Sequence, residues 1–258
     1  MTSTTLKPGQ VTTANAHSSQ LATLARQLMW SHQTIDELTS SATSDQLEFL
    51  TQAMTSETRH RDETRRARLA KKAGFPTWKT FTGYQWDQIK LPPGLTQDDI
   101  TETRFIPDHT NIVCYGPVGT GKTHLAIACG IAATSHGIPV RFTTVADLVL
   151  RLAEHATQGS LDRYLKDLNR AQLLILDEFG YVPIDKNAAR LLFQIIADAY
   201  ETRSLLITTN VPFSAWGGIL ADDQLAAALI DRVAHHGHLA TFTGDSYRMR
   251  HALMRQQT

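Results

Sequence analysis

The sequence has little cysteine and no long apolar run. Its 258 residues include two cysteines, Cys114 and Cys129, which do not show the CxxC or Cys/His spacing of metal sites. We expect both to be small core residues. No stretch approaches the roughly 18 uninterrupted apolar residues of a membrane span, and "MTSTTLKPGQVTTANAHSSQ" lacks the apolar region of a secretory signal. We therefore expect a cytoplasmic protein without a membrane partner.

An excess of charge of either sign is also missing. Lys plus Arg and Asp plus Glu each number 25, so overall charge predicts neither nucleic acid nor a membrane surface, and any basic footprint must be local. One such stretch is "RHRDETRRARLAKKAG", in which basic residues far outnumber the two acids, Asp62 and Glu63. Its side chains either form a solvated helix face or contact DNA or a partner; the DNA-binding candidates here are Arg65, Arg66 and Arg68.

Composition and periodicity divide the chain into four parts. Residues 1–17 are expected to be a disordered tail. Leu21, Leu24 and Leu28 recur at helical spacing, and "TSSATSD" separates them and Leu38 from Leu47, so residues 18–74 are expected to form a small helical domain. An aromatic linker at 75–108 contains prolines that preclude one long helix. Residues 109–258 carry the long apolar runs and form the second domain.

In this last part, short apolar strands alternate with amphipathic helices. The strands are expected at "NIVCY", "IPVRFTT", "QLLIL", "SLLITT" and "HLATFT". Because the apolar residues are continuous rather than alternating, the strands should be buried on both faces. The pattern predicts an α/β fold with a five-stranded parallel sheet flanked by helices.

The stretch "YGPVGTGKTHLA" follows the first of these strands and opens a helix. It satisfies G-x-x-x-x-G-K-[ST], a loop whose inward N–H groups and following helix N-terminus hold phosphate oxygens. Lys122 would bridge the outer phosphates of ATP, and the Thr123 hydroxyl would bind Mg²⁺. The alternative is a glycine-rich turn without a ligand. The predicted nucleotide-binding residues are Gly116, Pro117, Val118, Gly119, Thr120, Gly121, Lys122, Thr123 and His124.

Two acids end the strand in "LLILDEFG". Asp177 can hold Mg²⁺ through water, and Glu178 can polarise the water that attacks the γ-phosphate. Such a pair is typical of an ATPase. The alternative is that the acids cap a helix.

Two further polar residues suggest hydrolytic roles. Asn210 follows "ITT" at the predicted carboxyl edge of the sheet, where its amide could lie between the γ-phosphate and the water; it could also be an ordinary turn residue before Pro212. Arg232, in "ALIDRVAHH", suits a finger inserted into a neighbour's site, or else a surface pair with Asp231. The sequence lacks "NKxD" and "LSGGQ", which disfavours a GTPase and a transporter ATPase and leaves the AAA+ class.

Taken together, "GPVGTGKTHLAIACG", "LLILDEFGYVPID", "RSLLITTNVPFSAWGGIL" and "ALIDRVAHHGHLATFTGDSYRMR" resemble the IstB family, the ATPase helpers encoded beside the transposase of certain insertion sequences. The resemblance covers roughly Thr80 to the C-terminus. Its most specific part is the tail with "NVPFSAWG", "DRVAHHGH" and "GDSYR". Arg248 in "SYR" matches the family pattern without an assigned role.

The resemblance implies an AAA+ ATPase of the initiator and helicase-loader type, related to DnaC, with a helical N-terminal domain. It implies oligomerisation with ATP on duplex DNA and stimulation of a partner transposase. The roles given above to Lys122, Thr123, Asp177, Glu178 and Asn210 carry over, as does the finger role of Arg232. The chain ends at Thr258, soon after the last strand, so the helical lid of many AAA+ proteins is expected to be absent. Without a lid, a neighbouring protomer or the chain's own linker would have to close the nucleotide site. The aromatic residues of the linker, Phe75, Trp78, Phe81 and Tyr84, are therefore candidates for packing near the adenine, with core packing as the alternative.

The family comparison also implies an extra DNA-contacting helix between the second and third strands. In "LDRYLKDLNRA", Arg163, Lys166 and Arg170 are spaced by three and four residues and share one helix face. Such a face could follow phosphates without reading bases; the alternative is a solvated basic surface.

Other functions remain open at this point. A DnaC-like helicase loader shares the ATPase domain but acts on a helicase. A nucleotide-gated scaffold without turnover is disfavoured by Glu178, and a metabolic kinase by the lack of a recognisable acceptor site.

Overall fold

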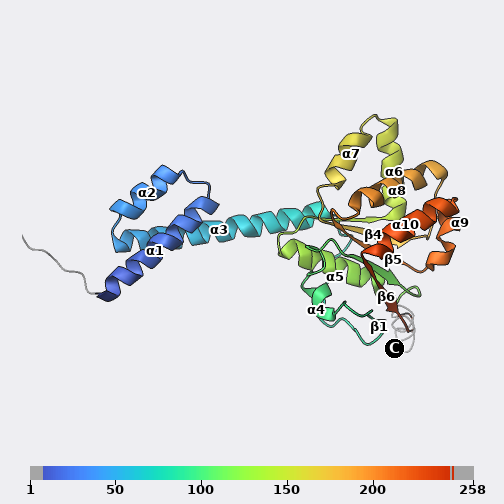
Figure 1. Ribbon diagram of the computed structural model, residues 1–258, viewed down its shortest axis with the longest axis horizontal. Coiled ribbons are helices and arrows are strands. Elements are labelled where there is room, and N and C mark those ends of the chain that lie inside the picture. Colours follow the sequence, from blue (N-terminus) through green and yellow to red (C-terminus); the bar gives the residue numbers. More distant parts are fainter. Residues whose placement is uncertain (1–7, 245, 247–258) are drawn as a thin grey trace, which may run out of the picture. The chain divides into compact units, whose positions relative to one another are not determined.

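The structure is a computed structural model that describes residues 8–244 and 246 (Figure 1). The chain divides into two compact units, Met1–Arg65 and Arg66–Thr258. Within the described residues, no helix combines the length and the apolar character needed to cross a membrane.

The first unit contains helices α1 (Pro8–Gln27), α2 (His32–Ser41) and the beginning of α3 (Ser44–Ala73). Its small core is formed by Leu21, Ala25, Ile35, Leu47 and Met54. Helix α1 begins at Pro8, inside the segment 1–17 that was expected to be disordered. The sequence did not predict this start because helical periodicity is recognised from apolar residues, and the first apolar residues with clear helical spacing begin at Leu21.

Helix α3 is 30 residues long and contains the whole basic run from Arg59 to Lys72. The division between the two units falls within it, between Arg65 and Arg66. The mean polarity of this helix is high and its basic side chains are exposed, so neither a core face nor a cap explains the concentration of positive charge.

The second unit is built on a six-stranded sheet in the order β1-β6-β2-β5-β4-β3. Five strands are parallel, as predicted: β2 (Asn111–Tyr115), β3 (Val140–Thr144), β4 (Leu173–Phe179), β5 (Ser204–Thr209) and β6 (Gly237–Phe242). A short sixth strand, β1 (Ile89–Lys90), pairs antiparallel with β6. This strand corrects the expectation of a purely parallel sheet; it lies in the predicted linker, where two residues are too few to produce a periodic signal.

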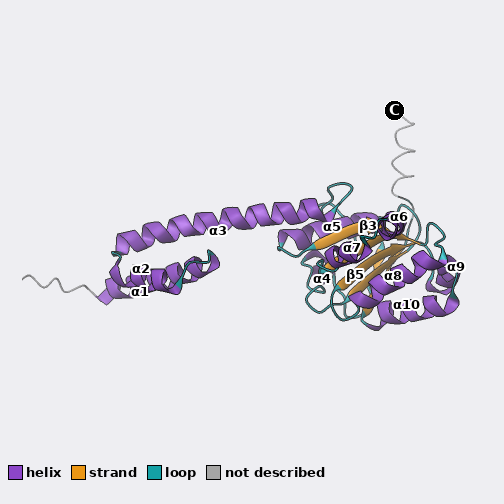
Figure 2. Cartoon of the chain, turned by 90° about the horizontal axis from the view of Figure 1, so that it is seen from above, coloured by secondary structure: helices purple, strands orange, loops and turns teal. Residues whose placement is uncertain are grey.

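Helices cover both faces of the sheet (Figure 2). The apolar core on one face includes residues of α5 (Lys122–Ser135), and the core on the other includes residues of α6, α8, α9 and α10. The bounds of the remaining elements are α6 (Val145–Thr157), α7 (Leu161–Leu168), α8 (Lys186–Ala199), η1 (Phe213–Ala215), α9 (Trp216–Leu220) and α10 (Asp223–His235). The sandwiched arrangement confirms the α/β prediction.

The first four residues of β4 are apolar because both faces of the strand are covered. Leu173 and Ile175 pack in the core on the α5 side, whereas Leu174 and Leu176 pack in the core on the α8 side. All four are fully buried, and each contributes roughly 1.5–3 kcal/mol relative to an exposed side chain. The strand is thereby held firmly enough to present Asp177 and Glu178 at its carboxyl end.

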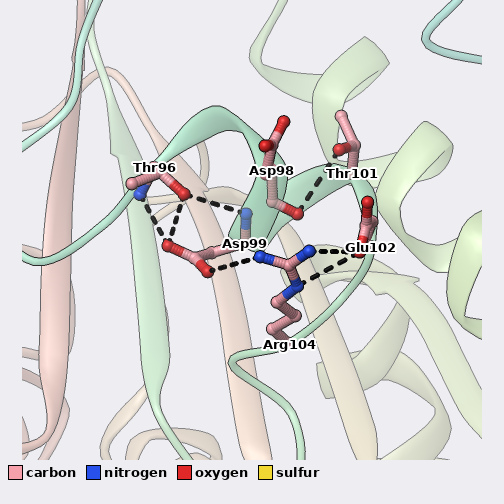
Figure 3. Close-up of polar contacts among 6 residues, drawn as sticks. All are labelled: Thr96, Asp98, Asp99, Thr101, Glu102 and Arg104. Atoms are coloured by element: carbon pink, nitrogen blue, oxygen red, sulfur yellow. Dashed lines mark hydrogen bonds and ion pairs between the residues drawn. The ribbon is translucent and has the colours of Figure 1, made fainter.

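The predicted linker also contains a short helix, α4 (Gln97–Thr101), which begins with a capping box. Figure 3 shows the Thr96 hydroxyl accepting a hydrogen bond from the Asp99 backbone N–H at 3.1 Å, while the Asp99 carboxylate accepts one from the Thr96 N–H at 2.9 Å. Arg104 binds Glu102 at 2.6 Å and reaches Asp99 at 4.0 Å. These local contacts satisfy the unpaired backbone groups at the start of α4.

Candidate active site

The phosphate loop joins β2 to α5 at the carboxyl edge of the sheet. Gly116 and Gly121 have φ of 155° and 97°, and Gly121 is the N-cap residue that directly precedes α5. A Cβ at Gly116 would lie 2.3 Å from the Phe242 carbonyl oxygen of β6. The loop therefore requires glycine at both positions for its backbone conformation, and at Gly116 also for its close approach to β6.

Lys122 is buried, and its ammonium group lies inside the curve of this loop. Its Nζ donates to the carbonyl oxygens of Gly116 at 2.8 Å and Pro117 at 2.7 Å. A buried ammonium needs such partners. The contacts hold the positive charge beside the loop backbone and the N-terminus of α5, the place where this type of loop holds phosphate oxygens.

The predicted magnesium ligands lie in direct contact. Thr123 Oγ1 donates to Asp177 Oδ1 at 3.0 Å, and Thr208 Oγ1 donates to the same oxygen at 2.5 Å. Asp177 is buried, with 3 % of its surface exposed. A hydroxyl and a carboxylate are oxygen ligands of the kind Mg²⁺ prefers, so the chemistry of this donor set fits the metal.

Glu178 has an unusual backbone conformation. Its φ is 61°, in the left-handed region that non-glycine residues rarely adopt. The register of β4 against β5 shifts between Leu176 and Phe179, and the Glu178 N–H donates to Thr208 Oγ1 at 3.0 Å. The side chain is exposed between two buried neighbours. Such strain costs about 1–3 kcal/mol and is concentrated at functional sites.

The ends of β2, β4 and β5 are joined by hydrogen bonds around Asn210. The Gly116 N–H donates to the Thr209 carbonyl at 3.2 Å, and Thr209 Oγ1 donates to the Phe179 carbonyl at 2.8 Å. Asn210 follows directly, and its Oδ1 is buried without a hydrogen-bond partner in the described structure. Buried polar atoms are nearly always bonded, so this oxygen fits a site built for a ligand or an ordered water.

The aromatic segment before β1 contacts the start of α5. Tyr84 Oη donates to the Gly121 carbonyl at 3.2 Å, and burial raises the pKa of Tyr84 well above its ordinary value. The ring of His124 lies 5.0 Å from that of Tyr84, and its Nε2 is 2.8 Å from the Thr80 carbonyl oxygen. The predicted nucleotide-binding residue His124 therefore directs its side chain to this segment. Trp78 of the same segment is 65 % exposed, so core packing does not account for it.

Arg232 lies towards the opposite edge of the sheet from the phosphate loop. Helix α10 ends at His235, and the next strand begins by pairing Gly237 with Asn111, the first residue of β2. Arg232 Nη1 donates to the Ala228 carbonyl at 2.9 Å, and its guanidinium lies 4.8 Å from the centre of the Phe193 ring. None of the ion pairs among the described residues includes Arg232, so the alternative of a surface pair with Asp231 is not observed.

The predicted DNA-contacting residues form two exposed groups. Arg163, Lys166 and Arg170 belong to α7 and the turn after it, and line a surface hollow of about 900 Å³. The other group, Arg65, Arg66 and Arg68, is exposed on α3. Arg248 lies outside the described residues.

Sequence reasoning missed two residues of consequence. Thr208 bonds both Asp177 and the backbone of Glu178, although the only signal for it was a threonine near the end of "ITTN". Asp167, inside the basic stripe of α7, binds Lys72 at 2.7 Å; the two residues are far apart in sequence, so no local pattern could have paired them.

The sequence matches the IstB-like ATP binding proteins over residues 14–255, most of the chain. It is 37 % identical over 185 residues to an insertion sequence IS232 putative ATP-binding protein of Bacillus thuringiensis subsp. berliner, covering 70 % of this chain and 73 % of the relative. It is 34 % identical over 206 residues to an insertion sequence IS21 putative ATP-binding protein of Pseudomonas aeruginosa, covering 79 % and 77 %. These matches confirm the resemblance found in the sequence.

Among solved structures, the DnaC helicase loader superposes with a TM-score of 0.50 at 23 % identity, covering 64 % of this chain and 96 % of that one. A DNA replication initiation factor superposes with a TM-score of 0.51 at 18 % identity, covering 69 % of this chain and about half, 53 %, of that one. At these identities the likeness concerns the fold alone. The chain therefore belongs to the IstB-like ATP-binding protein family and is an ATPase.

Proposed function

We propose that this protein is an ATP-dependent DNA-binding ATPase that oligomerises on duplex DNA and helps a partner transposase to use its target. The observation that carries the ATPase part is the contact of Thr123 with Asp177 next to the strained Glu178 and the unpaired Asn210 oxygen. Relatives named after insertion sequences support the role in transposition.

The residues at the site have distinct roles in this proposal. The N–H groups of the phosphate loop and Lys122 bind the phosphates of ATP, while Thr123 and Asp177 hold Mg²⁺, which neutralises phosphate charge when bound. Thr208 orients the Asp177 carboxylate. Glu178 accepts a proton from the attacking water, and the free oxygen of Asn210 accepts a hydrogen bond from that water and orients it.

Assembly would complete the site. Arg232 lies near the end of α10, on the side of the sheet remote from its own phosphate loop; this supports the proposal that it reaches the site of a neighbouring protomer, where an arginine can raise the rate by about 10³ or more. ATP would then hold protomers together, and hydrolysis would release them. Because the proposed target is DNA, we propose that the protein works in the cytoplasm.

Contact with DNA is proposed for the basic residues of α7 and α3. Their exposed Lys and Arg side chains suit phosphate contacts, which position a protein without reading sequence. Binding should therefore be largely independent of sequence and should weaken steeply with salt.

Light scattering on the purified protein, with and without ATP·Mg²⁺ and a duplex of arbitrary sequence, tests this function. We expect assembly only with both ligands, and none for Lys122→Ala. The matched control is Lys186→Ala, an exposed lysine at the first residue of α8, which should assemble as the unaltered protein does. A monomer unchanged by either ligand would favour a helicase-loader function, in which a partner protein nucleates assembly.

A further inference from the structure

The Asp167 carboxylate on α7 contacts three basic side chains from separate parts of the chain. Its carboxylate binds Lys72 Nζ of α3 at 2.7 Å and also binds Arg141 Nη2 of β3. Arg170 Nη1, just after α7, lies 3.9 Å away. Arg141 also donates from Nη1 to the Lys72 carbonyl at 2.7 Å. The last turn of α3 is thereby fastened to α7.

Because of this contact, two basic stripes that are far apart in the sequence lie next to each other and form one surface. Arg68 and Lys72 are four residues apart and share a face of α3. Arg163 and Lys166 on α7 and Arg170 in the turn after it lie around the hollow that Asp167 also lines. All five of these basic residues are exposed and belong to the second compact unit.

We propose that the end of α3 and α7 form one phosphate-binding track for duplex DNA, in which Asp167 holds Lys72 and Arg141 together until backbone phosphates take its place. The proposal rests on the proposed DNA-binding function and deepens it by naming the surface and its internal competitor. We call this surface the α3–α7 track, defined by Arg68, Lys72, Arg163, Lys166 and Arg170.

The charges of the track favour a phosphate ligand. Three cations share one carboxylate at Asp167, so positive charge is in excess, and Lys72 holds the pKa of that carboxyl below its ordinary value. The carboxylate is therefore ionised at neutral pH and competes with DNA for the same donors. Because the Lys72 and Asp167 side chains are 48 % and 35 % exposed, a phosphate can reach the pair without unfolding either helix.

The test is the salt dependence of binding to a duplex of arbitrary sequence, measured by fluorescence anisotropy with ATP·Mg²⁺. Lys72→Ala should weaken binding by roughly three- to tenfold at about 0.1 M salt and flatten the slope of log K against log salt by about 0.9. Asp167→Asn should do the reverse, with tighter binding and a slope steeper by about 0.9 to 1.8, since it frees one or two cations for phosphates.

Three matched variants separate this role from general charge or folding effects. Asp162→Asn removes an equal charge from the same hollow, but no ion pair among the described residues includes Asp162; its slope should stay unchanged. Asp167→Glu should keep the unaltered slope, and Lys90→Ala, an exposed lysine on β1, should match the parent protein.

The same measurements distinguish a failure of the α3–α7 track from a failure of the proposed DNA-binding function. Failure of the unaltered protein to bind any duplex would overturn the DNA-binding function itself. Normal binding with Lys72→Ala indistinguishable from Lys90→Ala would overturn the track alone, as would weaker binding by Asp167→Asn. A loss of transposase stimulation with an unchanged salt slope would also overturn it and would assign the surface to a protein partner.

Discussion

The phosphate-loop edge of the sheet and the α3–α7 track are both proposed to bind phosphate, but the charged groups are buried in the first and exposed in the second. At the sheet edge, Lys122 and Asp177 are buried, each with several fixed partners, and Glu178 is held in a strained conformation. On the track the cations are exposed and linked through one partly exposed carboxylate.

The difference lies in the cost of removing one group. A buried polar network loses the full desolvation energy of any group left unpaired, so single changes at the sheet edge should have large effects. An exposed cation is screened by water and salt and is one of several, so changes on the track should be graded. The predictions below test this contrast, beginning with the largest effect.

Lys122→Ala should weaken ATP binding by at least about 100-fold, because it removes charge-assisted hydrogen bonds to the phosphates in a site shielded from water. Titration with a fluorescent ATP analogue measures the effect. Lys186→Ala serves as the control. Retention of normal affinity by Lys122→Ala would show that the ammonium acts on the loop alone.

Glu178→Gln should lower ATP turnover by about 10²–10⁴-fold while leaving ATP binding intact, since the amide cannot accept the proton of the attacking water. Steady-state phosphate release, compared with equilibrium binding, separates the two effects. Glu154→Gln, at an exposed position on α6, should be neutral. Unchanged turnover in Glu178→Gln would defeat the hydrolytic role.

Thr208→Val should destabilise the protein by about 1–3 kcal/mol, because the buried Asp177 carboxylate and the Glu178 N–H both lose a partner. It should also raise the Mg²⁺ concentration needed for half-maximal turnover. Urea unfolding and a magnesium titration measure these effects. Thr202→Val, which only removes a hydroxyl bonded to helix carbonyls at the end of α8, should cost less and leave the magnesium requirement unchanged.

Lys166→Ala should weaken duplex binding only severalfold and flatten its salt slope by about 0.9. The change removes one exposed cation from a group, so turnover without DNA should stay as it was. A loss of DNA binding as complete as that expected for ATP binding in Lys122→Ala would contradict the contrast between the two regions.

Cys114, the penultimate residue of β2, should be unreactive in the native protein. Burial raises the pKa of its thiol to about 12, so the thiol stays protonated at pH 8, and the surrounding core excludes reagents. Iodoacetamide labelling followed by mass spectrometry should therefore modify Cys114 only after unfolding. Rapid labelling of the native protein would indicate that the end of β2 opens readily.

The sequence was most informative where the determining interactions are local. Continuous apolar runs predicted the five parallel strands, and the stretch "LDRYLKDLNRA" was correctly expected to be helical between the second and third of them. The phosphate loop could be recognised because its glycines, lysine and threonine act within a few residues of one another. Local signals failed for β1, which is too short for a pattern, and for the start of α1, which is polar.

The sequence by itself thus determined the α/β class, the family and the phosphate loop, because short-range periodicity and motif spacing specify them. Only the tertiary structure decided that Thr123 and Thr208 share the Asp177 carboxylate, that Glu178 adopts a left-handed conformation, and that Lys72 meets Asp167. Those contacts join residues 54, 31 and 95 positions apart. They arise from how the strands and helices pack, and no local pattern of residues encodes such packing.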